Sequence, residues 1–146
     1  MQGYFEDFEV GARLNTRTRV ISDQDHEAFC RLVGYEVPLF LDDAYARERG
    51  LPGRICPSHL IMSFSTAMTG DLFPETVLAM VGLDNARFLI PVRPGDTIRT
   101  EVEVLERRET SRRDRGTVVF RDHVFNQHGQ EVFQNDKTVL LKRRPA

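Results

Sequence analysis

The feature that most constrains the fold is a change in the spacing of apolar residues near Thr76. From there on, apolar and polar residues alternate along several segments, which is the pattern of strands with one buried face. The alternation is clearest over residues 98–104, where isoleucine, threonine and valine alternate with arginine and glutamate. The sequence therefore predicts four long consecutive strands, over residues 79–90, around 98–104, 117–126 and 131–142.

The segment just before these strands predicts a buried helix. Pro57 suits the first helical position and Gly70 the position after the last. Between them one apolar stripe runs at helical spacing: Leu60, Ile61, Phe64, Ala67 and Met68. The opposite face carries serine and threonine instead of lysine and glutamate, so we expect it to be enclosed too. A buried helix followed by four antiparallel strands indicates an α+β fold whose sheet wraps around the helix.

The first third of the chain adds shorter elements. Ser22 begins a predicted helix that stops at Gly34. A second short helix is expected over residues 42–49, capped by Asp42 or Asp43, and a strand over residues 11–20. A length of 146 residues is that of one ordinary domain, so residues 1–146 are predicted to form a single domain.

Charge and composition narrow the classes of partner. The net charge is −2, which gives no general attraction to nucleic acid or to acidic membranes. No apolar run approaches the roughly 20 residues of a membrane span, and no basic-then-apolar leader opens the chain, so a cytoplasmic location is expected. Cys30 and Cys56 lack metal or redox spacing and are expected as reduced thiols. The four histidines are scattered, so neither a metal nor a cofactor is predicted.

Five segments, in order, resemble one known family. They are residues 4–11, 22–29, 53–60, 87–89 and 91–97. Residues 53–60, Gly-Arg-Ile-Cys-Pro-Ser-His-Leu, are similar to the Gly-Arg-Ile-Ala-His-Gly segment of the MaoC-like dehydratases, the hydratase-2 type of (R)-specific enoyl-CoA hydratase. The resemblance runs nearly end to end and implies a hot-dog fold that binds an acyl-CoA thioester, with coenzyme A as part of the substrate. It also implies a homodimer, or a dimer of dimers or trimer of dimers, because an isolated sheet of this kind leaves one edge unpaired.

The catalytic motif of that family is altered here. The family pattern reads Gly-Asp-x-Asn-Pro-Leu-His, with a further Asp two residues later. The corresponding residues are Gly34-Tyr35-Glu36-Val37-Pro38-Leu39-Phe40, followed by Asp42. Tyr35 therefore occupies the position of the catalytic Asp, and Phe40 that of the catalytic His. Since phenylalanine cannot transfer a proton, the activity of a hydratase or dehydratase is left open.

Three residues are candidates for the missing acid and base. Tyr35 carries a phenol with an unperturbed pKa of about 10, which suits an acid better than a base. Glu36 is adjacent, and a loop rearrangement would turn it inward; the alternative is a solvated carboxylate. His59 lies beside the start of the buried helix and can act as a base; the alternative is a histidine hydrogen-bonded at a helix start.

The substrate-binding candidates lie at the same two places. The start of the buried helix at Pro57 can present the backbone N–H groups of residues such as Ser58 and Leu60 to a thioester carbonyl oxygen. Phe40 and Asp42 belong to the altered motif, although helix capping explains Asp42 without any ligand.

Other charged residues have more than one interpretation. The arginines of residues 107–115 can contact CoA phosphates or form a solvated hairpin loop. His26 is expected to be partly exposed or to line the pocket, whereas Asp122 and His123 lie in a strand and are interpreted as structural.

Three functions follow as alternatives. The first is an acyl-CoA hydratase or dehydratase, a lyase, that uses Tyr35, Glu36 or His59. The second is an acyl-thioester-binding homologue without activity, acting alone or beside an active subunit. The third, favoured least, is an acyl-CoA thioesterase. Fold alone does not decide among them, because activity depends on the site.

Overall fold

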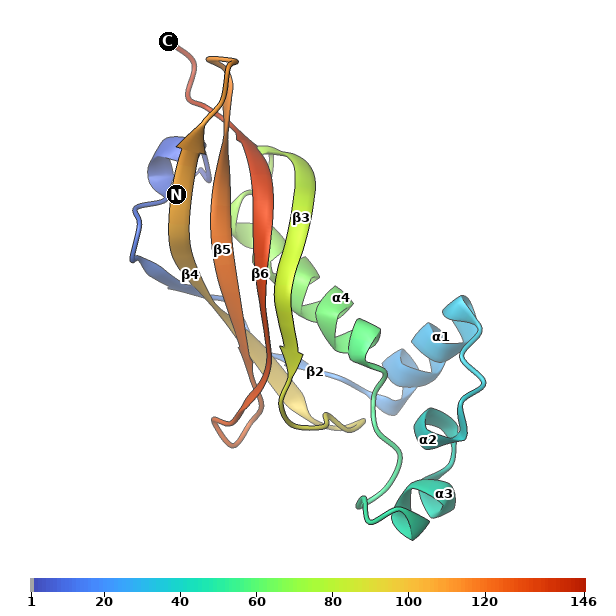
Figure 1. Ribbon diagram of the computed structural model, residues 1–146. Coiled ribbons are helices and arrows are strands. Elements are labelled where there is room, and N and C mark those ends of the chain that lie inside the picture. Colours follow the sequence, from blue (N-terminus) through green and yellow to red (C-terminus); the bar gives the residue numbers. More distant parts are fainter. Residues whose placement is uncertain (1) are drawn as a thin grey trace.

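The computed structural model describes residues 2–146 and contains one antiparallel sheet (Figure 1). The strands lie in the order β1-β4-β5-β6-β3, and β2 pairs with β4 beside β1. Their bounds are β1 Arg13–Asn15, β2 Arg19–Val20, β3 Val77–Phe88, β4 Thr97–Glu109, β5 Arg115–Phe125 and β6 Glu131–Lys142. The four predicted long strands are confirmed. The sheet has two edges, at β1 and at β3.

The strand expected over residues 11–20 is wrong as one continuous element. The structure divides it into β1 and β2, with residues 16–18 outside both. Asn15 pairs with Glu101, whereas Arg19 pairs with Ile98, so the register against β4 shifts by one residue between the two short strands. An extra residue of this kind bends a strand and ends its regular pairing.

The helices begin and end close to the predicted positions. They are α1 Asp23–Val33, α2 Pro38–Leu41, α3 Asp43–Glu48 and α4 Ser58–Met68, with short 3-10 helices η1 Phe5–Asp7 and η2 Thr69–Leu72. The Ser22 hydroxyl accepts from Asp25 N–H at 3.0 Å, and Gly34 ends α1 with a φ of 76°, as expected for the two caps. The chain continues from α4 directly into η2, so Gly70 does not end the helix as predicted.

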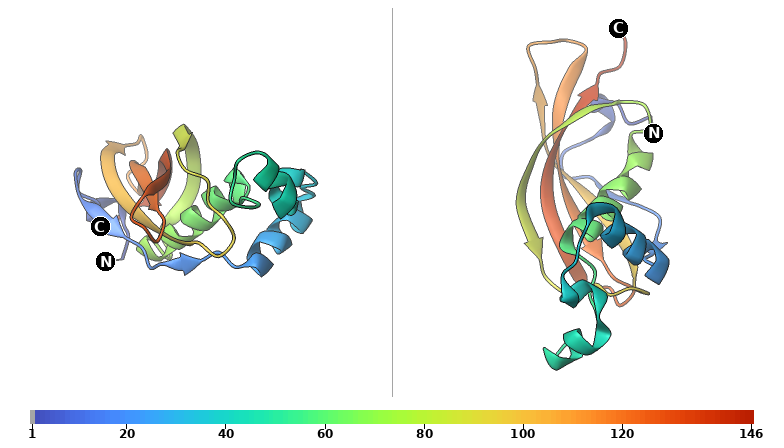
Figure 2. Two further views of the ribbon diagram at one scale, coloured as in Figure 1. Left: turned by 90° about the horizontal axis from the view of Figure 1, so that it is seen from below. Right: turned by 90° about the vertical axis from the view of Figure 1, so that its right-hand side faces the viewer.

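Helix α4 crosses one face of the sheet, and the sheet curves around it (Figures 1 and 2). One apolar cluster forms around its first half and includes Leu60, Ile61 and Phe133. A second cluster lies between the sheet and η1 and includes Phe8 and Phe120. This arrangement of an antiparallel sheet around a central helix is the hot-dog fold.

A buried polar layer separates the two apolar clusters. Lys137 Nζ lies 2.9 Å from Asp122 Oδ2, and the same ammonium donates to Thr69 Oγ1 at 2.8 Å. Both charged side chains are almost fully buried. Burial raises the pKa of Asp122, while the nearby Lys137 ammonium acts in the opposite direction. The pair thus joins β5 and β6 to the end of α4 through polar contacts inside the core.

The outer face of α4 is not enclosed within a single chain, which corrects the expectation from its composition. Ser63 of this face is exposed, and so is Ala67 of the predicted apolar stripe, whereas Ser65 is fully buried. The neighbouring strand β3 is exposed along most of its length, including Met80, Val81 and Leu83. The single chain therefore leaves an uncharged strip of α4 exposed beside an apolar edge strand, an arrangement that is atypical of a free surface.

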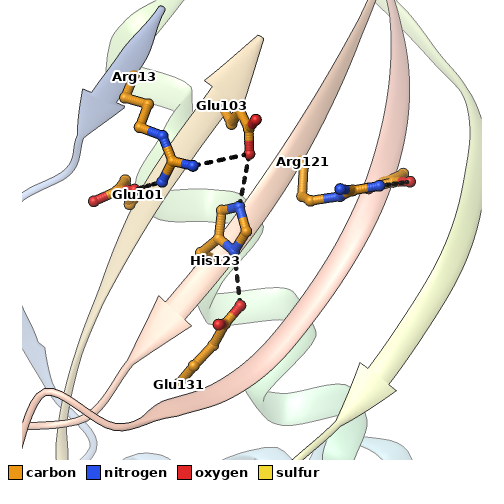
Figure 3. A network of polar contacts seen from close by, with 7 residues as sticks. Arg13, Glu101, Glu103, Arg121, His123 and Glu131 are labelled. Carbon is orange, nitrogen blue, oxygen red and sulfur yellow. Dashed lines mark hydrogen bonds and ion pairs between the residues drawn. The ribbon is translucent and has the colours of Figure 1, made fainter. Parts of the chain in front are cut away.

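Charged side chains form a network on the face of the sheet opposite α4 (Figure 3). His123 lies between two carboxylates, with Nε2 3.0 Å from Glu103 Oε2 and Nδ1 2.7 Å from Glu131 Oε1. Arg13, from β1, contacts Glu103 and Glu101. This network ties β1 to the centre of the sheet, in keeping with the predicted structural role of His123.

Candidate functional site

The first residues of α4 stand at an open end of the helix. Pro57 precedes it in an extended conformation, and Ser58 and His59, its first two residues, are both exposed. The first N–H groups of a helix have no acceptor inside the helix, and the helix dipole favours negative charge there. Leu60 differs, because its side chain is fully buried and its N–H donates to Pro57 O at 3.0 Å. The end of α4 therefore offers Ser58 and His59, rather than Leu60, to a ligand.

A hollow of about 190 Å³ lies on one side of this helix start, and we call it the β3-side hollow. Ser58 and Ile61 line it from α4, and Phe88 and Ile90 from the end of β3 and the residues after it. Cys56 also lines it, and burial raises the pKa of this thiol to about 12, so it stays protonated at neutral pH. The lining is mainly apolar and suits an apolar chain.

A second hollow, of about 450 Å³, lies between α1 and α4, and we call it the α1-side hollow. It is lined by Phe29 and Val33 of α1, by Tyr35, and by His59 and Ser63 of α4. Two of the three predicted catalytic residues, Tyr35 and His59, thus line the same hollow. The two hollows flank the same helix start, since Ser58 lines one and His59 the other.

The remaining predicted residues lie outside these two hollows. Glu36 is exposed and lines neither of them. Asp42 caps α3, because its Oδ1 accepts from Tyr45 N–H at 3.1 Å. The Phe40 ring packs edge-on against the Tyr35 ring, with 5.2 Å between ring centres. Phe40 therefore orients Tyr35 instead of carrying a polar group.

Sequence reasoning missed the residue that holds this loop. His26 was expected to be partly exposed or to line the pocket, but it is fully buried and lines neither hollow; its Nε2 donates to the carbonyl oxygen of Phe40 at 2.6 Å. The contact ties α1 to α2, which contains Pro38, Leu39 and Phe40 of the altered motif. The only indication of this contact in the sequence was the place of His26 in the first turn of a capped helix. The hydrogen-bond partner of His26 is a backbone oxygen, and a pattern of side chains cannot predict such a partner.

Arg54 is a second residue that the sequence did not single out by itself. Its guanidinium lies 2.9 Å from Asp23 Oδ1 and 3.3 Å from Glu27 Oε1, both on α1. Its backbone N–H donates to Asp43 Oδ1 at 2.9 Å, and this contact lowers the pKa of that carboxyl. The segment leading into α4 is therefore fixed to α1 and α3, which sets the width of the α1-side hollow.

The arginines of the β4–β5 hairpin lie far from this site within one chain. Figure 1 shows the hairpin at one end of the sheet and the start of α4 at the other. Arg115 pairs with Asp114 at 3.0 Å, and Arg112 lies 3.6 Å from the same carboxylate. The hairpin is exposed, so within one chain the solvated-loop interpretation describes it.

None of the helices within residues 2–146 combines the length and the apolar character needed to cross a bilayer.

Comparisons with known proteins agree with this architecture. The mesaconyl-CoA hydratase of Cereibacter sphaeroides is 30% identical over 145 residues, which are 97% of this chain and 41% of that protein. The R-hydratase PhaJ1 of Pseudomonas aeruginosa superimposes with a TM-score of 0.78 at 28% identity, over 98% of this chain and 88% of that one. A conserved hypothetical protein of Mycobacterium tuberculosis, described as having a double hotdogfold, superimposes with a TM-score of 0.88 at 22% identity, over 97% of this chain and 44% of that one.

The chain spans about two-fifths of the length of the mesaconyl-CoA hydratase that it matches. The family description "MaoC like domain" matches residues 7–124. These residues include α1, the altered motif, both hollows except Val132, and β3 to β5. The chain belongs to the family of MaoC-like domains.

Proposed function

We propose that this chain binds an acyl-CoA thioester with the carbonyl oxygen at the start of α4, and that it hydrates an enoyl group held there. The observation that carries the proposal is that His59 and Tyr35 both line the α1-side hollow, at the start of α4. The first N–H groups of this helix favour the negative charge that develops on the thioester oxygen. Two relatives with hydratase names, for mesaconyl-CoA and for R-hydratase PhaJ1, support the reaction class.

The chemistry requires one proton to leave water and one to reach the α-carbon. His59 accepts the proton of the water whose oxygen adds to the β-carbon, because a neutral imidazole carries a basic ring nitrogen. The α-carbon then takes a proton, and either the protonated His59 or the Tyr35 phenol supplies it. When His59 supplies the proton, the cycle closes directly; when Tyr35 supplies it, the proton held by His59 must pass to the Tyr35 phenolate before the next turnover, so that the net reaction adds one water across the double bond.

The test is the loss of the conjugated-thioester absorbance when purified protein is mixed with crotonyl-CoA or mesaconyl-CoA. We expect His59→Gln to lower kcat/KM about 100-fold, and Tyr35→Phe to lower it less. Glu36→Gln is the matched control, because its carboxyl is exposed and lines neither hollow; it should leave the rate unchanged. A wild-type rate that His59→Gln leaves intact would contradict this assignment.

A second candidate function is acyl-thioester binding without turnover. It is favoured by the replacement of the family's acid–base pair by Tyr35 and Phe40, whose rings pack against each other. Binding of crotonyl-CoA by the wild-type protein, with no turnover at any chain length, would establish this alternative. Release of free CoA would instead establish the thioesterase.

We also infer that the chain works as a homodimer, or as an assembly of such dimers. The edge strand β3 exposes apolar side chains on both faces, including Met80, Val81 and Leu83. Strand edges of this kind pair readily with another chain, and the double hotdogfold of the mycobacterial protein supports pairing of two such units. The exposed Ser63 and Ala67 on α4 lie on the surface that a second copy would cover.

A further inference from the structure

Two side chains of the sheet carry polar atoms that are buried without a partner. Asn135 of β6 is fully buried, and neither its amide nitrogen nor its amide oxygen has a hydrogen-bond partner within residues 2–146. Asp122 of β5 is also fully buried. Its Oδ2 lies 2.9 Å from Lys137 Nζ, but its Oδ1 has no partner in the described part of the chain. Such atoms are costly to bury, and nearly all buried polar atoms of folded proteins are hydrogen-bonded.

Asn135 and Asp122 are direct neighbours in the sheet. They occupy opposite positions in the register of β5 against β6. Side chains at opposite positions point to the same face, with Cβ atoms about 5 Å apart. That face is the one that α4 crosses, because Asp122 contacts Lys137, whose ammonium donates to Thr69 directly after α4. The unpartnered atoms of Asn135 and Asp122 therefore belong to one site in the buried polar layer.

The polar side chains of α4 near this layer already have partners. Ser65 Oγ donates to Met62 O at 3.1 Å, and Thr69 Oγ1 donates to Thr66 O at 2.7 Å. These bonds stay within α4 and the residue that follows it. Asn135 and Asp122 lie opposite each other, yet no hydrogen bond joins their side chains. Partners for the free atoms must therefore come from outside residues 2–146.

The chemistry of the free atoms selects the kind of ligand. Asp122 Oδ1 accepts a hydrogen bond, whereas the Asn135 amide offers a donor and an acceptor, so the ligand needs both capacities. An ion is disfavoured because the opposite charges of Asp122 and Lys137 compensate each other at 2.9 Å. Water is neutral, both donates and accepts, and satisfies the amide in either of its two orientations.

We propose that at least one water molecule is bound between β5 and β6 beside the end of α4, where it donates to Asp122 Oδ1 and bonds to the Asn135 amide. Buried waters typically make about three hydrogen bonds to polar groups that would otherwise be unsatisfied. The water links the amide, which has no partner within the described residues, to the ion pair of Asp122 and Lys137. The second half of α4 thus rests on a hydrated polar layer between the two apolar clusters.

A crystal structure of the full chain, at a resolution that shows ordered water, is the direct test. We expect density for a water within about 2.6–3.2 Å of both the Asn135 amide and Asp122 Oδ1. A direct hydrogen bond between Asn135 and Asp122, with no density between them, would overturn the proposal. A chloride or metal ion at this place, identified by its anomalous scattering, would overturn it too.

Magnetic relaxation dispersion of water oxygen-17 compares the number of long-lived waters in solution. The bound water is expected to be long-lived, because the side chains that hold it are fully buried and exchange requires this part of the core to open. Asn135→Leu replaces the amide by an apolar group of similar size and should lose at least one long-lived water. Gln134→Met is the matched control, because the neighbouring side chain on β6 is only half-buried and points to the other face; it should keep the wild-type number.

A second variant covers the case in which Asn135→Leu does not fold. Asn135→Ser keeps a hydrogen-bonding group and leaves more room, so it should retain at least as many long-lived waters as the wild type. A lower number in Asn135→Ser, or equal numbers in the wild type and a folded Asn135→Leu, would refute the water site.

Discussion

Individual side chains around the altered motif hold the loop in place, although the acid and base of the family are absent from it. The His26 imidazole donates to the carbonyl oxygen of Phe40, and a backbone acceptor does not depend on which side chain stands at that position. The Phe40 ring in turn packs on Tyr35. In the proposed reaction, proton transfer therefore depends on His59 of α4 and on Tyr35 of the segment after α1, which line the same hollow.

The buried pair of Asp122 and Lys137 has a large predicted effect on stability. Replacing Lys137 by methionine leaves the Asp122 carboxylate buried without its cation, which costs about 3–5 kcal/mol. Urea denaturation measures the free energy of unfolding. Asp122→Leu/Lys137→Met should recover much of the loss, because no buried charge remains. Arg31→Met, at an exposed position, is the control; a similar small change in Lys137→Met and Arg31→Met would contradict the prediction.

The His123 site predicts a pH-dependent contribution to stability. Partial burial acts to lower the pKa of His123, but the hydrogen-bonded Glu103 and Glu131 outweigh it and raise this pKa. A raised pKa in the folded state means that the stabilisation is fully present below the unfolded value of about 6.5 and is lost as pH rises through the folded value. The difference in unfolding free energy between wild type and His123→Gln should therefore be larger at about pH 5.5 than at about pH 9. An equal difference at both values would refute this role.

The elements show what the sequence could and could not predict. Ser22 and Gly34 mark the ends of α1 correctly because caps depend on local hydrogen bonds and backbone conformation. The strands were predictable from their alternation, whereas the break between β1 and β2 was not, since a one-residue shift in register depends on the partner strand. The uncharged face of α4 was interpreted as interior, but Ser63 and Ala67 are exposed in the single chain. The residue composition of a helix face can favour a covered surface, but it does not identify the chain that would cover it.

The same limit applies to the site. The resemblance singled out Tyr35 by its position in the motif, and His59 was singled out by its place beside the start of the buried helix; that both line one hollow is seen only in the structure. The contact of His26 with a backbone oxygen, and the burial of Asp122 and Lys137 as a pair, could not be predicted. Both depend on which residues of distant segments lie opposite each other, and alternation indicates only which face a residue occupies.

A crowded contact predicts how η1 attaches to the sheet. A side-chain carbon added at Gly116, on β5, would lie 2.6 Å from atoms of the buried Phe5 ring. Gly116→Ala should therefore displace η1 and lower the free energy of unfolding by about 1–3 kcal/mol. Gly82→Ala on β3 is the matched control, because the nearest atom there is 3.9 Å away. Thermal denaturation of the two variants compares them, and equal midpoints would contradict the crowding.

The whole molecule is predicted to associate through β3. Val81 lies on this edge and is 57% exposed, and Val10, in the turn before β1, is 62% exposed. Val81→Lys places a charge on the pairing edge and should shift the protein toward monomer, whereas the same change at Val10 should not. Size-exclusion chromatography with light scattering measures the mass of each. A wild-type protein that is monomeric at micromolar concentration would refute the association.

The position of Phe88 links the free edge of the sheet to the candidate site. This residue lines the β3-side hollow and also ends the strand through which we expect two copies to pair. If a ligand binds the paired form more tightly than the single subunit, its binding must strengthen the pairing of the subunits. The factor is the same as that by which pairing raises the affinity for the ligand. Dilution would then weaken the binding of the thioester, because the separated subunits have a lower affinity for it. Saturating thioester would in turn keep the subunits assembled at protein concentrations where the ligand-free protein has dissociated.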